Sequence, residues 1–248
     1  MSAGKGAVVV TGGSRGIGRA AAILLAQAGY EVLVTYRQQA GKAEKVVAGI
    51  HAEGGHATAL KMNLPEDDVA TWFKRTDKFF HRPLVGLVNN AAYVPPRQRL
   101  VDADLADWRR AFDVNVLSVA GLCREAFLRM AKSRGGSGGS IVNVSSQVAA
   151  FGAADLAGYS ASKGAANALT LSLAREFGSE GVRVNAVSPG LIVDEDGSGG
   201  DARQRAQVTQ VPLGRLGEPC DVGELITWLI SSKSAFVTGT IIPVHGGR

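Results

Sequence analysis

Hydrophobic and polar positions along the chain follow two alternating patterns. Short runs of consecutive apolar, often β-branched residues are typical of strands buried on both faces, and longer segments with apolar residues three or four positions apart are typical of amphipathic helices. The first pattern predicts strands at 7–10, 31–36, 57–62, 84–88, 141–144, 182–187 and about 240–244. The second predicts helices from the first glycine-rich turn to residue 28 and at 41–53, 66–80, 105–131, 156–177 and 221–231. This βαβ repetition predicts an α/β fold with a parallel sheet.

Composition favours a single domain over residues 1–248. The chain is 46% hydrophobic, with a mean hydropathy of +0.08, which is enough apolar sequence for one sizeable core. The glycine-rich stretches at 135–139 and 197–200 are interpreted as loops within one fold, because neither resembles a linker. We expect a cofactor-binding half at about 1–145, a catalytic and substrate half at about 146–248, and a mobile lid at about 194–211.

Charge and cysteine content exclude several classes of protein. Two cysteines, Cys123 and Cys220, match no metal-ligand or redox spacing, so we expect no metal site and a reducing compartment. We expect a cytoplasmic, soluble protein, because no apolar signal region and no run of about 18 apolar residues occurs. The net charge of +5 comes from dispersed basic residues without an aromatic-interleaved stripe, which favours an anionic small molecule over nucleic acid or a membrane.

A glycine-rich turn follows the first predicted strand. It reads Thr11-Gly12-Gly13-Ser14-Arg15-Gly16-Ile17-Gly18 and leads into an alanine-rich helical stretch. Glycines at such a strand-to-helix turn let the backbone approach a pyrophosphate and present helix N-terminal amides to it. The turn lacks the Gly-Lys-Ser/Thr ending of phosphate-loop NTPases, so it predicts a dinucleotide site; a glycine-rich turn without a ligand is the alternative.

Candidate acid-base chemistry lies in the second half of the chain. Tyr159 and Lys163 stand four positions apart in a predicted helix, which places them on one face, and Ser146 lies a short way upstream. A nearby cation favours phenolate, so we expect the pKa of Tyr159 to be lowered toward the working range. Taken alone, this spacing is also common on ordinary amphipathic helices.

Six motifs in order resemble the short-chain dehydrogenase/reductase family. They are the glycine turn, Asn89-Asn90-Ala91-Ala92, Asn115, Ser146, Tyr159-xxx-Lys163 and Ser188-Pro189-Gly190, and together they cover essentially the whole chain. The sequence is most similar to the bacterial branch of 3-oxoacyl carrier-protein reductases and glucose or ribitol dehydrogenases. The resemblance implies a Rossmann-like doubly wound domain with a seven-stranded parallel sheet and helices on both faces. It also implies hydride transfer with NAD(P).

The resemblance assigns roles to individual residues. It implies that Tyr159 supplies the proton, Ser146 donates to the substrate oxygen, Lys163 binds the nicotinamide ribose, and Asn115 holds a water in a relay to Lys163. Ser145 is an adjacent decoy, because neighbours on an extended segment face opposite ways. The cofactor-binding residues that we expect are Gly12, Ser14, Arg15, Gly16, Ile17, Gly18, Arg37, Asn63, Asn90, Ala91, Tyr159, Lys163, Pro189, Gly190 and Ile192.

Three positions depart from the family pattern. Asn63 replaces an aspartate that contacts adenine, and its amide oxygen can still accept a hydrogen bond. Ala92 replaces a glycine beside the cofactor. Asp194 stands where the family has a threonine that binds the nicotinamide carboxamide, and it either touches the ring or begins a solvated acidic lid.

The end of the second strand predicts a preference for NADP(H) over NAD(H). NAD-selective sites place an acid about 20 residues past the glycine turn to bind the ribose 2′-hydroxyl. Here the segment 35–39 holds no acid, and Glu31 lies too early in the strand. Arg15 and Arg37 can instead clasp a 2′-phosphate; the alternative is that both are solvated surface arginines.

These features predict an NADPH-dependent carbonyl reductase or alcohol dehydrogenase. We expect its substrate to be a small ketone, a sugar or polyol, or a 3-oxoacyl thioester. An NADP-binding sensor or scaffold without turnover is the alternative, and a nucleotide-sugar epimerase is disfavoured by the short region after Gly190. Apolar residues in excess on two long helices, among them Val119, Ala166, Leu169 and Leu173, further predict a homotetramer or a dimer.

Overall fold

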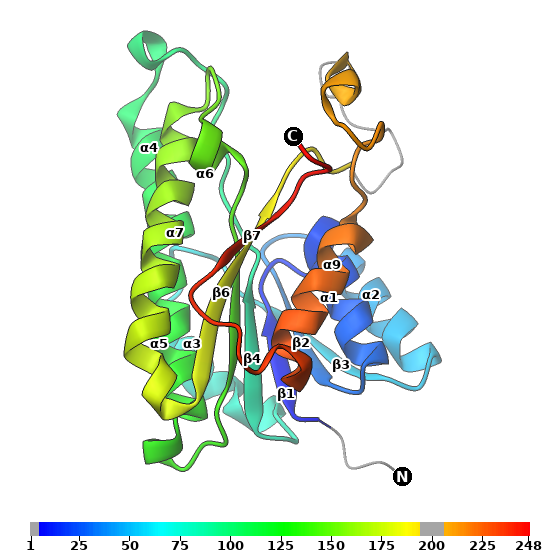
Figure 1. Ribbon diagram of the computed structural model, residues 1–248. Coiled ribbons are helices and arrows are strands. Elements are labelled where there is room, and N and C mark those ends of the chain that lie inside the picture. The colour runs from blue at the N-terminus through cyan, green and yellow to red at the C-terminus, as the bar shows by residue number, and fades with distance from the viewer. Residues whose placement is uncertain (1–4, 194–205) are drawn as a thin grey trace.

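The fold is built on one seven-stranded parallel sheet. The computed structural model describes residues 5–193 and 206–248, and Figure 1 shows the sheet seen along its edge between two layers of helices. The strand order is β3-β2-β1-β4-β5-β6-β7, and every pairing is parallel. The strands are β1 (Ala7–Val10), β2 (Glu31–Tyr36), β3 (His56–Lys61), β4 (Leu84–Asn89), β5 (Gly139–Val144), β6 (Val182–Pro189) and β7 (Ile241–Val244). The predicted α/β fold is confirmed.

Helices cover both faces of the sheet (Figure 1). One layer consists of α1 (Gly16–Gln27), α2 (Ala40–Ala52) and α9 (Pro219–Ile230), and the other of α3 (Val69–Thr76), α4 (Leu105–Phe112), α5 (Ser118–Met130) and α7 (Ala157–Phe177). The short α6 (Val148–Phe151) follows β5 and contacts α7. Strand order reverses between β1 and β4, so the loops that leave their carboxyl ends diverge and open a crevice there.

Burial on both faces explains the uniform apolar strands. All four residues of β1 are fully buried. Val8 and Val10 pack in the cluster that contains α1 and α9, whereas Val9 packs in the cluster that contains α3 and α5. A strand in this position has no solvated side, so it requires apolar residues in sequence rather than alternation.

Two predicted helices differ from the observed ones. The helix expected at 66–80 begins only at Val69, because the Asp68 carboxylate accepts a hydrogen bond from Thr71 N at 2.8 Å and caps it, and it ends in a 3₁₀ turn at Asp77–Phe79. The helix expected at 105–131 is interrupted by a π-helical turn at Asp113–Leu117, which separates α4 from α5.

The predicted lid overlaps a part of the chain that the structure does not describe. Residues 194–205, including Asp194, lie outside the described residues. The described remainder of the lid contains a 3₁₀ turn at Val208–Gln210. Across residues 5–193 and 206–248, none of the helices combines the length and the apolar character needed to cross a membrane.

Candidate active site

The glycine turn between β1 and α1 is held in a fixed shape by Asn90. The Asn90 side-chain amide donates to Thr11 O at 2.9 Å and to Gly12 O at 3.1 Å. Gly12 has a φ of +64°, a conformation that favours glycine, and a Cβ at Gly18 would lie 2.4 Å from Asn90 Nδ2. The two positions therefore require glycine. The Asn90 side chain supports the turn through its two hydrogen bonds to the backbone.

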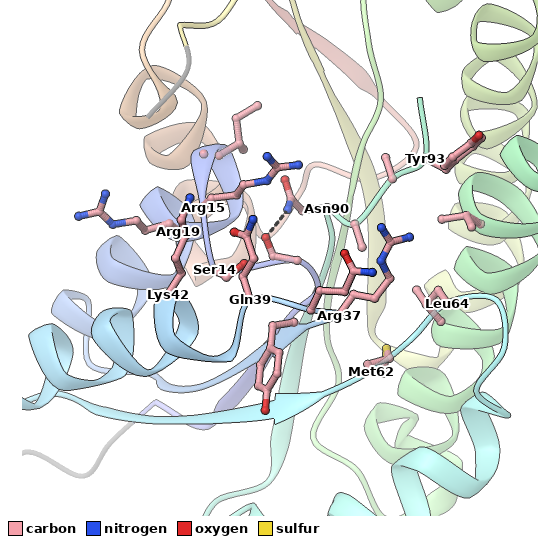
Figure 2. Close-up of a pocket in the computed structure, with 18 of the residues that line it drawn as sticks. Ser14, Arg15, Arg19, Arg37, Gln39, Lys42, Met62, Leu64, Asn90 and Tyr93 are labelled. Carbon is pink, nitrogen blue, oxygen red and sulfur yellow. Dashed lines mark hydrogen bonds between the residues drawn. The ribbon is translucent and has the colours of Figure 1, made fainter. Parts of the chain in front are cut away.

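A pocket of about 1010 Å³ opens over this turn at the carboxyl ends of β1, β2 and β4 (Figure 2). The start of α1 lies at its floor, and the first turn of that helix, Gly16 to Arg19, contains no acid. The amino-terminal end of a helix carries a partial positive charge, which suits an anion. Eight of the predicted cofactor residues line the pocket: Gly12, Ser14, Arg15, Gly16, Ile17, Arg37, Asn90 and Ala91.

Four basic side chains line the same pocket. Arg15 and Arg37 were predicted, whereas Arg19 and Lys42 were missed by the sequence analysis. Figure 2 shows Arg19 and Lys42 together beyond Arg15, with Arg37 on the other side. Arg19 follows Arg15 by four residues at the start of a predicted helix, and this spacing is the sequence signal by which it could have been found. Among the described residues, Arg15, Arg37 and Lys42 form no salt bridge, so their charges remain available to a ligand.

The remaining predicted cofactor residues do not line this pocket. The wall beside β3 is formed by Met62 and Leu64, while Asn63 N donates to Asp67 Oδ2 at 2.7 Å. Pro189 O accepts from Gln147 N at 2.9 Å, and Ile192 forms a bridge with Gly217. The pocket lining also excludes Gly18, Gly190, Tyr159 and Lys163. The pocket therefore covers the part of the expected site at the glycine turn and the basic residues, and not the part at Tyr159.

Ser146, Tyr159 and Lys163 meet beside the end of β5. The side chains of Tyr159 and Ser146 lie near each other, and the Ser146 hydroxyl acts to lower the pKa of Tyr159. Lys163 is buried, its ammonium donates to Val144 O at 2.7 Å, and it lies 5.8 Å from the centroid of the Tyr159 ring. The neighbouring Ser145 is buried, whereas Ser146 is partly exposed. The helical spacing thus brings the hydroxyl pair and the ammonium together as predicted.

The pKa of Tyr159 is shifted in the opposite direction to the one predicted. Burial raises the pKa of Tyr159 to about 12, and the Ser146 hydroxyl offsets this only in part. Burial also lowers the pKa of Lys163 to about 8. The prediction was wrong because it weighed the charge of Lys163 and neglected desolvation, which penalises the charged form of both groups.

Replacing Lys163 by Met should change how stability depends on pH. The folded pKa of Lys163 is about 8 and its ordinary value is 10.5, so the unfolded chain binds more protons between these values. The unfolding free energy of the wild type should therefore rise by about 3 kcal/mol relative to Lys163→Met as the pH increases from 7 to 10.5. Urea unfolding of both proteins at several pH values checks this, and parallel profiles would show that Lys163 is solvated in the folded protein.

Asn115 joins the loop after β4 to α7. It lies in the π-helical turn, where its Oδ1 accepts from Tyr93 N at 2.8 Å and its Nδ2 donates to Tyr93 O at 2.9 Å and to Ser162 Oγ at 3.0 Å. π-helical turns occur frequently at functional sites. Both ends of this amide are engaged, so in this structure Asn115 positions the pocket wall at Tyr93 against the helix of Tyr159.

Known proteins are similar to this chain over almost its entire length. A family model described as enoyl-(acyl carrier protein) reductase matches residues 12–248. The oxidoreductase YgfF of Escherichia coli K12 is 41% identical over 244 residues, which cover 97% of this chain and 98% of that protein. The 3-oxoacyl-[acyl-carrier-protein] reductase FabG of Staphylococcus aureus Mu50 is 38% identical over 241 residues, 96% of each chain.

Solved structures agree with this relationship. A dehydrogenase/reductase from Sinorhizobium meliloti 1021 superimposes with a TM-score of 0.90 at 32% identity, covering 99% of this chain and 96% of that one. A Beutenbergia cavernae protein described as an NAD(P)-dependent gluconate 5-dehydrogenase, with bound NADP at low occupancy, gives a TM-score of 0.88 at 32% identity, covering 99% and 97%. Fold, site and relatives together show that the chain belongs to the short-chain dehydrogenase/reductase family, whose members are NAD(P)-using oxidoreductases acting on CH–OH or carbonyl groups.

Proposed function

We propose that the protein is an NADPH-dependent carbonyl reductase that also runs as an alcohol dehydrogenase, with Tyr159 as the acid-base group. The observation that carries this proposal is the proximity of Ser146, Tyr159 and the buried Lys163, whose ammonium lies 5.8 Å from the Tyr159 ring centroid, in a chain whose glycine turn is shaped for a dinucleotide. When bound, the dinucleotide supplies the hydride that reduces the carbonyl carbon.

The protein side chains handle the proton. With a pKa of about 12, Tyr159 is protonated at neutral pH and can donate from Oη to the developing alkoxide, while Ser146 donates a hydrogen bond to the same oxygen. The phenolate left on Tyr159 is favoured by the nearby Lys163 ammonium. The carbonyl thus gains a hydride and a proton and leaves as an alcohol, and solvent restores the proton to Tyr159.

The charges in the pocket support NADPH as the preferred coenzyme. The two arginines and the lysine without described salt bridges (Arg15, Arg37 and Lys42) approach the pocket from α1 and from the loop and helix after β2. Segment 35–39 at the end of β2 supplies no carboxylate. A 2′-phosphate adds about two negative charges here, whereas NADH would leave the cations unpaired.

Two substrate classes are consistent with the relatives. FabG of Staphylococcus aureus is a 3-oxoacyl thioester reductase by its name, and the Beutenbergia cavernae neighbour is described as a gluconate dehydrogenase. The absorbance of NADPH tests the proposal: it should fall with acetoacetyl thioesters, diketones, aldoses or ketoses as substrates, and rise when a polyol is oxidised with NADP⁺. Turnover of at least one carbonyl class supports an enzyme; coenzyme binding with no turnover of any would favour the sensor or scaffold alternative.

We further propose that the chain assembles as a homotetramer. Val119 and Ala166, predicted to lie at an interface, are buried in the chain's own core, and Leu169 and Leu173 pack against that core. Other large apolar side chains are exposed instead: Leu117 and Leu171 on the α5–α7 side, and Trp228 and Phe236 near the β7 edge. Two separate apolar surfaces suit two symmetric contacts.

Light scattering at micromolar concentration should give about four times the chain mass of 25.7 kDa. Phe236→Ser, which removes a fully exposed ring near the β7 edge, should lower the mass to that of a dimer. A mass near 25.7 kDa for the unaltered protein contradicts the tetramer.

A further inference from the structure

Three segments that follow neighbouring strands meet beside Ser146. Gln147 is the next residue after Ser146, and its backbone N–H donates to Pro189 O at the end of β6. A Cβ added at Gly190 would lie 3.1 Å from Gln147 Oε1 and 2.6 Å from His245 Cβ. Gln147 Oε1 and the Cβ of His245 therefore both lie close to Gly190, at the carboxyl ends of β5, β6 and β7.

The Gln147 side chain offers an unused hydrogen-bonding atom there. Its Oε1 is buried and has no hydrogen-bond partner among residues 5–193 and 206–248. A buried polar atom without a partner is unfavourable, so such atoms in folded proteins commonly serve a ligand or a water. An amide side chain can accept through its oxygen and donate through its nitrogen.

His245 supplies a donor of defined position. Its Nδ1 accepts a hydrogen bond from Gly247 N at 3.2 Å, so the ring hydrogen of the neutral imidazole is on Nε2. The ring packs against Phe151 of α6 at 6.4 Å between centroids, with the planes at 68°. The backbone turn on one side and Phe151 on the other thus hold the imidazole beside Gly190.

We propose that Gln147 and His245 bind a hydroxyl group on the carbon next to the substrate carbonyl. This inference rests on the proposed reduction at Ser146 and Tyr159, and it selects α-hydroxy ketones, with the vicinal diols that they yield, over unsubstituted ketones and oxoacyl thioesters. A hydroxyl can donate to Gln147 Oε1 and accept from His245 Nε2–H, whereas an alkyl chain satisfies neither atom. We place this hydroxyl on the carbon next to the carbonyl because Gln147 directly follows Ser146 in the chain.

A matched substrate pair tests the proposal. Hydroxyacetone and 2-butanone have the same number of heavy atoms and differ in a hydroxyl against a methyl group. The ratio of their kcat/KM values in the wild type should fall roughly tenfold or more in Gln147→Leu and in His245→Phe, because a site built for a hydroxyl loses its discrimination with either partner. The loss should lie in the hydroxyacetone value, with 2-butanone kcat/KM within about twofold of the wild type.

Controls separate this inference from the proposed function. Gln27→Leu, an exposed glutamine at the end of α1, should leave the ratio unchanged. Gln147→Glu keeps an acceptor for the hydroxyl and should retain more of the preference than Gln147→Leu. An unchanged ratio in both Gln147→Leu and His245→Phe, or an equal loss for both ketones, overturns the hydroxyl site. Activity of Tyr159→Phe toward both ketones would instead overturn the proposed function itself.

Discussion

Tyr159→Phe should lower kcat by about a thousandfold and leave NADPH affinity within about twofold, because the variant keeps the ring and loses only the transferable proton. Tyr159 lies near Ser146 and outside the lining of the dinucleotide pocket, so removal of its hydroxyl should spare coenzyme binding. Single-turnover rates and NADPH fluorescence titration measure the two quantities separately.

Two neighbouring serines provide a matched control for this result. Ser146→Ala should lower kcat by roughly a hundredfold, whereas Ser145→Ala should leave it nearly unchanged, because Tyr159 interacts with Ser146 and not with Ser145. Unaltered turnover in Tyr159→Phe excludes Tyr159 as the acid. An equal loss of kcat in the two serine variants would show that this segment is needed for folding and that Ser146 does not bind the substrate oxygen.

The double change Arg15→Ala with Arg37→Ala should remove the coenzyme preference. Each charge-assisted hydrogen bond to a phosphate contributes about 1.5–3 kcal/mol, so the ratio of kcat/KM for NADPH over NADH should fall by a hundredfold or more. The efficiency with NADH should change little, because its ribose presents no phosphate to these groups. Steady-state kinetics with both coenzymes at one salt concentration measures the ratio.

Arg82 provides the comparison for the loss of positive charge. It is half-buried and its guanidinium donates to Gly29 O at 3.4 Å near the amino ends of the strands, away from the pocket, so Arg82→Ala should leave the ratio intact. Equal kcat/KM values for NADH and NADPH in the wild type would contradict the predicted preference for NADPH. An unchanged ratio in the double variant would transfer the phosphate-binding role to Arg19 and Lys42, the other cations of the pocket.

The sequence predicted the sheet well because buried parallel strands leave few choices. A run such as Ala7–Val10 must satisfy two apolar surfaces, and its observed bounds are those predicted. Helix ends were harder to predict. The start of α3 depends on the Asp68 cap, and the π-helical turn around Asn115 depends on hydrogen bonds to Tyr93, a contact between segments distant in sequence.

The candidate site was predicted in its residues and less well in its energetics. Helical spacing placed Tyr159 and Lys163 on one face, and the family resemblance added Ser146 to them. Burial is a property of the packed fold, so the raised pKa of Tyr159 could not be inferred from the spacing. For the same reason Lys42, which reaches the pocket from the start of α2, was missed.

The most direct test of the account follows the hydride. NADPH carrying deuterium at the transferable position of the nicotinamide is incubated with the enzyme and its best ketone, and the alcohol is examined by mass spectrometry. A carbonyl reductase must place one deuterium on the carbinol carbon for each NADPH oxidised, and Tyr159→Phe must abolish this product. Tight NADPH binding with no labelled alcohol from any carbonyl class would contradict the account and assign the protein a binding role.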